Sequence, residues 1–224
     1  MQDYKRAIII GSKQTYGKGT VQNVLDLNRM VRSNTNGDLG ALKFTTQKYY
    51  RINGGSTQLE GVKSDIVVPN KYTYVDYGEK DQENPLEWDM IDPVSYEPWK
   101  SFFDYNKTID ASKNRMKSSE FISLIDENAR WIKSIRDRDI YTLNYKKFKE
   151  DLLINEEKAK KYKKLSDYST NLTFKSLPYE INLIIKDSSL GEKRKRWHKN
   201  LSKDIYVNEA LNVLNDLRLS YVER

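Results

Sequence analysis

One stretch of the chain places three glycines around a lysine: Gly11-Ser12-Lys13-Gln14-Thr15-Tyr16-Gly17-Lys18-Gly19-Thr20-Val21-Gln22. Residues 7–10 are β-branched after an alanine and predict a short buried strand that leads into this loop. After it, Val21, Leu25 and Leu27 follow the period of two that is typical of another strand. Glycines let a backbone turn sharply and approach its neighbours closely. A lysine at such a corner is suited to bind a phosphate or to act as a catalytic amine.

The spacing of this loop differs from that of a nucleotide-binding P-loop. A Walker A loop has the form Gly-x-x-x-x-Gly-Lys-Ser/Thr, and the helix that follows directs its N-terminus at the phosphates. Here five residues separate Gly11 from Gly17, Gly19 takes the place of the hydroxyl residue, and a strand is predicted next. Nucleotide binding is therefore disfavoured. A catalytic lysine and a plain glycine-rich hairpin with an exposed lysine both stay open.

Three blocks of sequence carry a more specific signal. They are residues 15–22 (TYGKGTVQ), residues 39–58 (LGALKFTTQKYYRINGGSTQ) and residues 61–69 (GVKSDIVVP). In this order they resemble the carboxy-terminal processing peptidases, most closely the tail-specific protease branch. The rest of the chain resembles, more weakly, the helical C-terminal domain of the same proteases. The resemblance implies a serine endopeptidase that uses a serine–lysine dyad and recognises proteins by an apolar free C-terminus.

The resemblance implies roles for three residues. Lys18 matches the base, a neutral amine that takes the proton from the serine hydroxyl as its oxygen attacks the peptide carbonyl. An unperturbed lysine, with a pKa near about 10.4, is protonated at neutral pH, so such a site must lower that value by desolvation. Gln22 matches the glutamine that holds the lysine. Asp3 matches an acidic residue assigned to the site, although an aspartate at a helix end is the simpler interpretation.

The chain also departs from the family pattern. Tyr16 stands where the family commonly has phenylalanine, and one extra residue separates Gly11 from Thr15. Only 17 residues precede Lys18, fewer than the family spacing from serine to lysine. The nucleophilic serine and a PDZ domain are therefore expected upstream of residue 1. We expect the 224-residue chain alone to be inactive.

Other catalytic and cofactor chemistry has little support in the sequence. Ser12 and Ser56 lie near glycines but lack a nucleophile-elbow pattern, and the only histidine, His198, lies in a basic run. The chain has no cysteine, so thiolate metal sites and disulfides are excluded. Carboxylates without histidine or cysteine clusters offer only weak oxygen sites. We predict no metal and no cofactor.

Composition narrows the choice of partners. The charged fraction of 32% and the apolar fraction of 38% suit a small core with long solvated helices. The net charge of +7 divides into +4 over residues 1–82 and +3 over residues 83–224, whereas nucleic-acid binders concentrate positive charge on one surface. No window approaches 18 apolar residues, so no membrane span is predicted. The lysines of residues 158–164 follow acidic residues at helical spacing and predict a salt-bridged face, while the basic run 193–199 suits an acidic partner.

The predicted fold class is α+β, an incomplete β-rich protease-core segment followed by a mainly helical C-terminal domain. Residues 1–77 are expected to be the C-terminal part of the peptidase domain, residues 78–104 a bridge rich in proline and tryptophan, and residues 105–224 the helical domain. Within the first part, residues 42–52 predict a long central strand, which residues 53–56 end with a turn, and residues 64–69 predict a short strand. Residues 28–38 predict a polar loop.

Helical periodicity takes over from Ser112 onward. Ser112, Ser118 or Ser119 is expected to cap a helix, because glutamate follows this group of serines. The predicted apolar positions are Phe121, Leu124, Ile125, Ala129 and Ile132 in this helix, Phe148, Leu152 and Leu153 in a helix over 143–168, and Ala210, Leu211, Leu214 and Leu217 in a helix over 204–221. Residues 173–186 predict a strand or an irregular segment.

The resemblance implies a location in the periplasm or envelope of a Gram-negative-type bacterium, with protein substrates and an adaptor protein on the helical domain. Trp88 and Trp99 are expected to hold the helical domain against the protease core, since large aromatic rings bury much area at little entropic cost. The competing hypothesis is a non-catalytic scaffold that binds a partner protein through its helical domain. A serine upstream in the reading frame distinguishes the two hypotheses.

Overall fold

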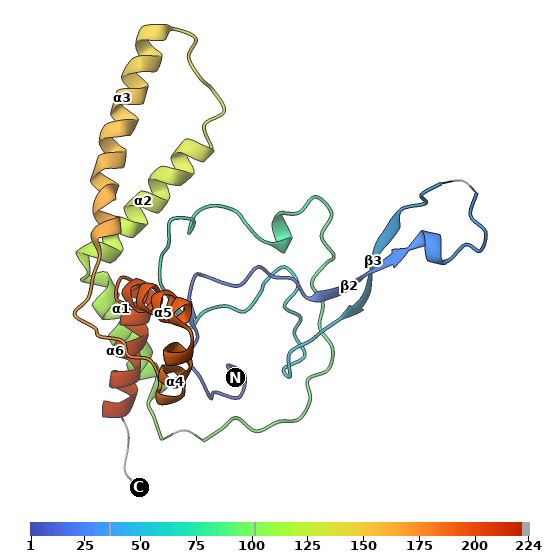
Figure 1. Ribbon diagram of the computed structural model, residues 1–224, viewed down its shortest axis with the longest axis horizontal. Helices are drawn as coiled ribbons and strands as arrows, with labels where there is room; N and C mark the ends of the chain where they lie inside the picture. The colour runs from blue at the N-terminus through green and yellow to red at the C-terminus, as the bar shows by residue number, and fades with distance from the viewer. Residues whose placement is uncertain (36, 101, 221–224) are drawn as a thin grey trace. The chain divides into compact units, whose positions relative to one another are not determined.

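The computed structural model describes residues 1–35, 37–100 and 102–220 of the chain. The described residues form two compact units. Unit 1 comprises Met1–Ile9, Lys13–Ser64 and Asp76–Lys100, and unit 2 comprises Ile10–Ser12, Asp65–Val75 and the described residues from 102 to 220. Each unit is therefore discontinuous in the sequence. The fold class is α+β, as the sequence predicts, with short strands in the first part of the chain and helices in the second (Figure 1).

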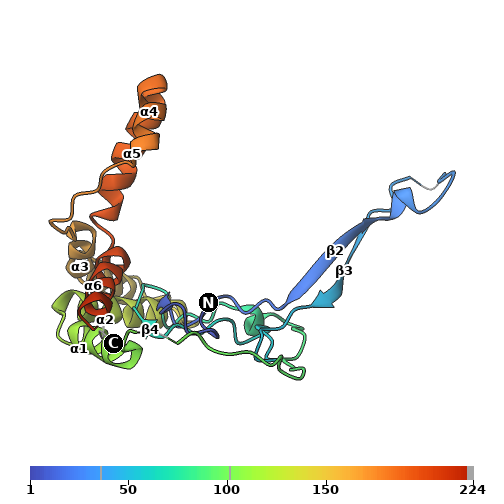
Figure 2. The same cartoon turned by 90° about the horizontal axis from the view of Figure 1, so that it is seen from below.

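Unit 1 contains an antiparallel ribbon of two strands, β2 (Thr20–Asp26) and β3 (Ala41–Lys48). The two strands lie side by side in both views (Figures 1 and 2). The strand predicted after the glycine loop is confirmed. The strand predicted over residues 42–52 is confirmed up to Lys48. Its central position and its continuation to residue 52 are wrong, because β3 ends at Lys48 and has β2 as its one strand partner among the described residues. β-Propensity shows that a segment suits a pleated surface, not how many partners that surface has.

The turn at residues 53–56 follows the prediction. Gly54 has a φ of +85°, a left-handed conformation that side chains with a Cβ rarely adopt, and its amide donates to the carbonyl of Arg51 at 2.9 Å. A Cβ on Gly54 would lie 2.1 Å from the carbonyl oxygen of Ile91. Glycine is therefore required here both by conformation and by the close approach of residues 91–93.

The bridge residues up to Lys100 contact unit 1. The Trp88 indole Nε1 donates to the carbonyl of Ser56 at 2.9 Å, and the Trp99 amide donates to the carbonyl of Tyr4 at 2.9 Å. The guanidinium of Arg6 lies over the Trp99 ring, 5.5 Å from its centroid. Both tryptophans thus hold parts of unit 1, which differs from the role expected for them with the helical domain.

The interior of unit 1 is polar. Among its described residues, the buried side chains are those of Thr20, Ser56 and Gln58, and Gln58 is 0% exposed. Hydrogen bonds to these groups, together with close approaches of glycine backbone, therefore hold this unit more than apolar packing does.

Unit 2 begins with a short parallel pair, β1 (Ile10–Gly11) and β4 (Ile66–Val67). The short strand predicted within residues 64–69 is confirmed, and the Val68 amide extends the pairing by donating to the carbonyl of Gly11 at 2.8 Å. The buried strand predicted over residues 7–10 is wrong, because strand pairing reaches only Ile10 and these residues are partly exposed. Ile66 and Val68, both 0% exposed, occupy the core instead.

The α-helices of the described residues all belong to unit 2. They are α1 (Tyr105–Lys117), α2 (Glu120–Arg136), α3 (Tyr145–Tyr162), α4 (Pro178–Lys186), α5 (Ser188–Leu201) and α6 (Ile205–Leu219). Five of them start after a side chain that accepts a hydrogen bond from the first turn, namely Asp104, Ser119, Asn144, Asp187 and Asp204. The cap at Ser119 and the helix after Asp204 confirm two predictions. No helix in the described ranges combines the length and apolar character that crossing a lipid bilayer requires.

Several helical predictions are wrong in part. The helix predicted over residues 143–168 is present as α3, which a 3₁₀ helix continues over Lys163–Asp167, but Phe148, Leu152 and Leu153 are exposed rather than inward. Periodicity identifies the face that is able to pack, but not whether another element covers it. The segment expected as a strand or irregular contains α4, whose first residue, Pro178, stands where helices favour proline. The basic run 193–199 forms part of α5, a helix that the sequence prediction omitted.

α1 and α6 lie side by side in both views and form the centre of unit 2 (Figures 1 and 2). Ser112, predicted as a helix cap, is instead buried in the middle of α1 and donates to Glu209 at 2.5 Å. On α6 the buried residues are Glu209 and Val213, whereas Leu211 and Leu214 of the predicted stripe are exposed. The buried face of α6 differs from the predicted apolar stripe because polar side chains of α1, Ser112 and Arg115, donate to the carboxylate of Glu209. The predicted end of this helix at residue 221 lies outside the described residues.

Candidate active site

The glycine loop of unit 1 brings Lys18 and Gln22 together. The Lys18 Nζ atom donates to the Gln22 Oε1 atom at 2.8 Å. In a regular strand two residues at this spacing would lie about 13 Å apart along the chain. The glycine corner bends the chain before β2, and a bulge between Val21 and Gln22 shifts the register and redirects the side chain. The amide oxygen of Gln22 thus fixes the direction of the amine.

Gly17 and Gly19, on either side of the lysine, are both buried. Gly17 has a φ of +91°, and its carbonyl accepts from the Leu59 amide at 2.7 Å. The Gly19 amide donates to Gln58 Oε1 at 2.8 Å, and the Gly19 carbonyl accepts from the Tyr49 amide at 3.1 Å. A Cβ on Gly19 would lie 2.5 Å from the Gln58 nitrogen. The backbone therefore comes so close to residues 56–59 that only glycine fits on the C-terminal side of the lysine.

The carbonyl of Lys18 has two hydroxyl donors. The Thr57 Oγ1 atom donates to it at 3.2 Å, and the Tyr49 hydroxyl donates to it as well. Together with the hydrogen bond on the next amide, these contacts fix the backbone from which the lysine side chain extends.

Asp3 is bound elsewhere in unit 1. Its carboxylate forms an ion pair with Arg51, whose Nε donates to the Asp3 Oδ2 atom at 2.9 Å, and Arg51 also donates to Gln2 at 2.9 Å. Residues 2–5 form a turn rather than the end of a helix. The structure thus joins Lys18 and Gln22, while the contacts that it gives Asp3 tie the start of the chain to the segment after β3.

A second polar cluster supports residues 56–58. Asp89 accepts from the Lys48 ammonium and from the Tyr50 hydroxyl, both at 3.0 Å. The hydrogen bond from Lys48 lowers the pKa of the Asp89 carboxyl, and desolvation together with the bond to Asp89 raises the pKa of the Tyr50 hydroxyl. The backbone carbonyl of Asp89 accepts from the Ser56 amide at 3.2 Å. This cluster is structural support for the segment that contacts the lysine corner.

The remaining polar residues considered in the sequence have structural surroundings. The Ser56 hydroxyl accepts from the Gln58 amide at 3.0 Å, and His198 lies on α5 with its ring 5.5 Å from that of Trp197. Ser12 belongs to unit 2 and is exposed. Within the described ranges, no group of three or more histidine and carboxylate side chains is arranged to hold a metal ion.

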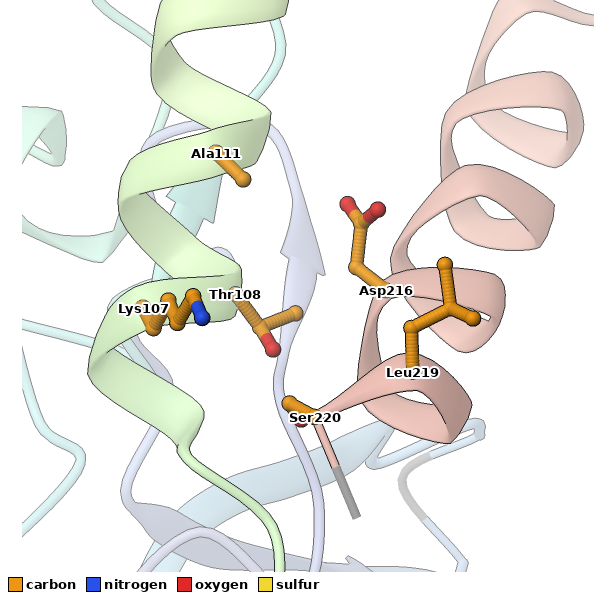
Figure 3. A pocket seen from close by; sticks show the side chains of 6 residues that line it. All are labelled: Lys107, Thr108, Ala111, Asp216, Leu219 and Ser220. Atoms are coloured by element: carbon orange, nitrogen blue, oxygen red, sulfur yellow. The ribbon is translucent and has the colours of Figure 1, made fainter.

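A pocket of about 140 Å³ lies between α1 and α6 of unit 2 (Figure 3). It is lined by Lys107, Thr108, Ala111, Asp216, Leu219 and Ser220. Ligand pockets typically measure about 300–1,000 Å³, so this space is too small for a peptide substrate. It is a packing gap between two helices and no candidate for the active site.

With this geometry in view, the chain was compared with known proteins. Residues 72–218 match the family model described as the C-terminal domain of tail specific protease (DUF3340), and residues 1–68 match the model of peptidase family S41. The chain belongs to the tail-specific protease family. The resemblance drawn from the glycine loop and the two blocks after it is thus confirmed.

The chain matches part of the length of two bacterial relatives. It is 40% identical over 151 residues to the tail-specific protease of Haemophilus influenzae, an alignment that covers 65% of this chain and 21% of that protein. It is 43% identical over 76 residues to the carboxy-terminal-processing protease of Bartonella bacilliformis, which covers 32% of this chain and 15% of that protein. The alignments span about a fifth of the length of the first relative and less of the second.

The sequence analysis missed the residues that surround the backbone of Lys18 in this tail-specific protease chain. Tyr49, Thr57 and Gln58 all contact Lys18 or Gly19, but they lie 31 to 39 positions away from these partners in the chain. They do fall within the block 39–58 that carries the resemblance. Their position in that block was the available signal that they matter to the site. The resemblance of the block assigns no role to any one of its residues.

Proposed function

We propose that this chain supplies the catalytic lysine of a serine endopeptidase, whose nucleophilic serine belongs to a part of the protein outside these 224 residues. The observation that carries the proposal is the hydrogen bond of Lys18 to Gln22 at a corner that only glycines can form. The neutral amine of Lys18 takes the proton of the serine hydroxyl as its oxygen attacks the substrate carbonyl. The resulting ammonium then returns the proton to the leaving amine of the cleaved peptide.

Gln22 orients the amine during these transfers and takes no proton itself. Its carboxamide oxygen accepts a hydrogen bond from lysine in both protonation states, so the same contact serves before and after the transfer. For Asp3 we propose a supporting role through its ion pair with Arg51, which anchors the segment that leads into the glycine loop.

The substrates that we propose are proteins recognised by an apolar free C-terminus in the envelope of a bacterium, as the family resemblance implies. The domain assignment that accompanies this function is residues 1–77 for the peptidase part, residues 78–104 for the bridge and residues 105–224 for the helical domain, on which an adaptor protein would bind. Because a base without its nucleophile forms no acyl-enzyme, the 224-residue chain alone should leave a test peptide intact.

The test is Lys18→Ala in the complete protease, assayed with a peptide that ends in an apolar residue. Turnover should fall at least about 1,000-fold with little change in KM, since lysine and serine act as one unit. Gln22→Ala should cause a smaller loss, because it removes only the orienting contact. Lys13→Ala, an exposed lysine of the same loop, is the matched control and should keep normal turnover. Near-normal turnover in Lys18→Ala would show that the lysine is structural and that the dyad assignment is wrong.

A further inference from the structure

We propose that Gln58 is a positioning residue for the lysine base, an inference that rests on the proposed function of Lys18. Gln58 contacts neither the lysine side chain nor Gln22 in the structure. It acts on the peptide unit that joins Lys18 to Gly19.

The side chain of Gln58 is 0% exposed, and both ends of its amide are engaged. Its Oε1 atom accepts from the Gly19 amide at 2.8 Å, and its Nε2 atom donates to the Leu86 carbonyl at 3.0 Å and to Glu79 Oε1 at 3.3 Å. If the side-chain amide of Gln58 were turned by 180°, its NH2 group would face the Gly19 N–H, and its oxygen would face the Leu86 carbonyl and the Glu79 carboxylate. The neighbours therefore permit one orientation only, with the acceptor facing Gly19.

Neighbouring residues hold the two ends of this peptide unit. The carbonyl of Lys18 and the N–H of Gly19 point to opposite sides of a planar trans peptide. Thr57 donates to the carbonyl, and Gln58 accepts from the N–H. The peptide plane next to the lysine Cα therefore cannot rotate without breaking a bond on each side, and the direction of the lysine side chain depends on that plane.

The segment that carries Gln58 is itself held in place. The Ser56 Oγ atom accepts from the Gln58 amide at 3.0 Å, the Trp88 indole donates to the Ser56 carbonyl at 2.9 Å, and the Asp89 carbonyl accepts from the Ser56 amide at 3.2 Å. A catalytic side chain keeps its geometry when the residues around it are fixed by packing and hydrogen bonds. Through these contacts the bridge residues Trp88 and Asp89 restrict the movement of Gln58, and Gln58 in turn restricts the backbone next to Lys18.

The first experiment compares Gln58→Met with the unchanged complete protease. Methionine keeps a similar length but removes the acceptor for the Gly19 amide, so the lysine corner should loosen. A displacement of about 1 Å at a catalytic group can cost about 100-fold in rate, and we expect a loss of this size in kcat with KM changed less than about 3-fold.

The control is Gln14→Met, the same change at a partly buried glutamine whose Nε2 contacts the Leu59 carbonyl at 3.5 Å. It should keep kcat within about 3-fold of the normal value, because it leaves the acceptor of the Gly19 amide in place. Gln58→Asn is the second variant, in which the amide remains but is one methylene too short to reach Gly19. If circular dichroism shows that Gln58→Met does not fold, Gln58→Asn provides the same test of the inference.

A second measurement needs no catalysis. In the 224-residue chain, Gln58→Met should speed hydrogen exchange of the Gly19 amide at least about 10-fold, while the Leu59 amide, which donates to Gly17, should change little. Unchanged exchange at Gly19 would overturn the inference.

The outcomes for Lys18 and Gln58 are separable. If Lys18→Ala keeps its turnover, the proposed function is wrong, and the inference is lost with it. If Lys18→Ala loses turnover while a folded Gln58 variant keeps its kcat, only the inference is wrong. Loss of kcat together with faster exchange of the Gly19 amide supports both.

Discussion

Replacing Glu209 by alanine should destabilise unit 2 more than any change at an exposed carboxylate of the helices. Glu209 is 5% exposed at the contact between α1 and α6. It accepts from the Ser112 hydroxyl at 2.5 Å and from the guanidinium of Arg115 at 2.8 and 3.2 Å. Arg115 also pairs with Asp216 at 2.9 Å. One carboxylate thus satisfies polar groups on the buried face of the neighbouring helix.

The loss of unfolding free energy expected for Glu209→Ala follows from these hydrogen-bond partners. Ser112 is 0% exposed, and a buried hydroxyl that loses its acceptor costs about 1–3 kcal/mol. The bond to Arg115 contributes less than a fully buried pair, because the arginine side chain is 35% exposed and keeps Asp216 as a partner. We assign it about 1 kcal/mol, near the upper end for a solvent-screened pair. The free energy of unfolding should therefore fall by about 2–4 kcal/mol.

Urea unfolding of the 224-residue chain, followed by helical circular dichroism, measures this change. With a dependence on urea of about 1–3 kcal/mol per molar, the midpoint should fall by about 1 M or more. Glu192→Ala on α5 is the control, since Glu192 is 67% exposed and forms a surface ion pair with Lys195. It should change stability by less than about 0.5 kcal/mol. If Glu209→Ala shifted the midpoint no more than this control, the carboxylate would not be what holds α1 to α6.

Two further predictions concern a carboxylate and a helix cap. The hydrogen bond from Lys48 lowers the folded-state pKa of Asp89, so the Asp89 carboxylate stabilises the protein above the ordinary carboxyl pKa near about 3.9 and loses this contribution as the pH falls through the lower folded-state pKa. Asp89→Asn should therefore reduce the difference between the urea midpoints measured at about pH 6 and pH 3. An unchanged difference would contradict the assignment. Ser119→Ala should cost about 1 kcal/mol by removing the acceptor for the Ile122 amide at the start of α2, whereas Ser119→Asp should restore most of the urea midpoint.

Local signals in the sequence predicted much of this fold. Ser119 and Asp204 marked helix starts because capping depends on a side chain and the amides next to it in the chain. The residues that were placed wrongly depend on distant partners. Phe148 has the periodicity of a buried face, but the structure leaves it exposed, and Ser112 resembled a cap although it lies in a core that α6 completes with Glu209.

The candidate site divides in the same way. Lys18 and Gln22 were recognisable because residues 15–22 form one contiguous motif that resembles the family, and the structure joins their side chains at 2.8 Å. Gln58 was not recognisable as a contact of Gly19, since a spacing of 39 residues along the chain does not reveal which strands and turns meet. Hydrogen-bonded interiors of this kind leave no periodic pattern of apolar residues.

The discontinuity of unit 2 bears on how genes for such proteins can recombine. The two family matches meet between residues 68 and 72, which looks like a natural crossover point. The structure places that junction inside one unit, where Val68 donates to Gly11 and its carbonyl accepts from the Tyr206 hydroxyl of α6 at 3.3 Å. A chimera joined there would put a foreign Ile66 and Val68 into the core of a resident helical bundle. A recombinant gene joined at this point should therefore encode a stable protein only when the β4 of one parent packs well against the α6 of the other. We expect the two parts of the gene to be inherited together for this reason.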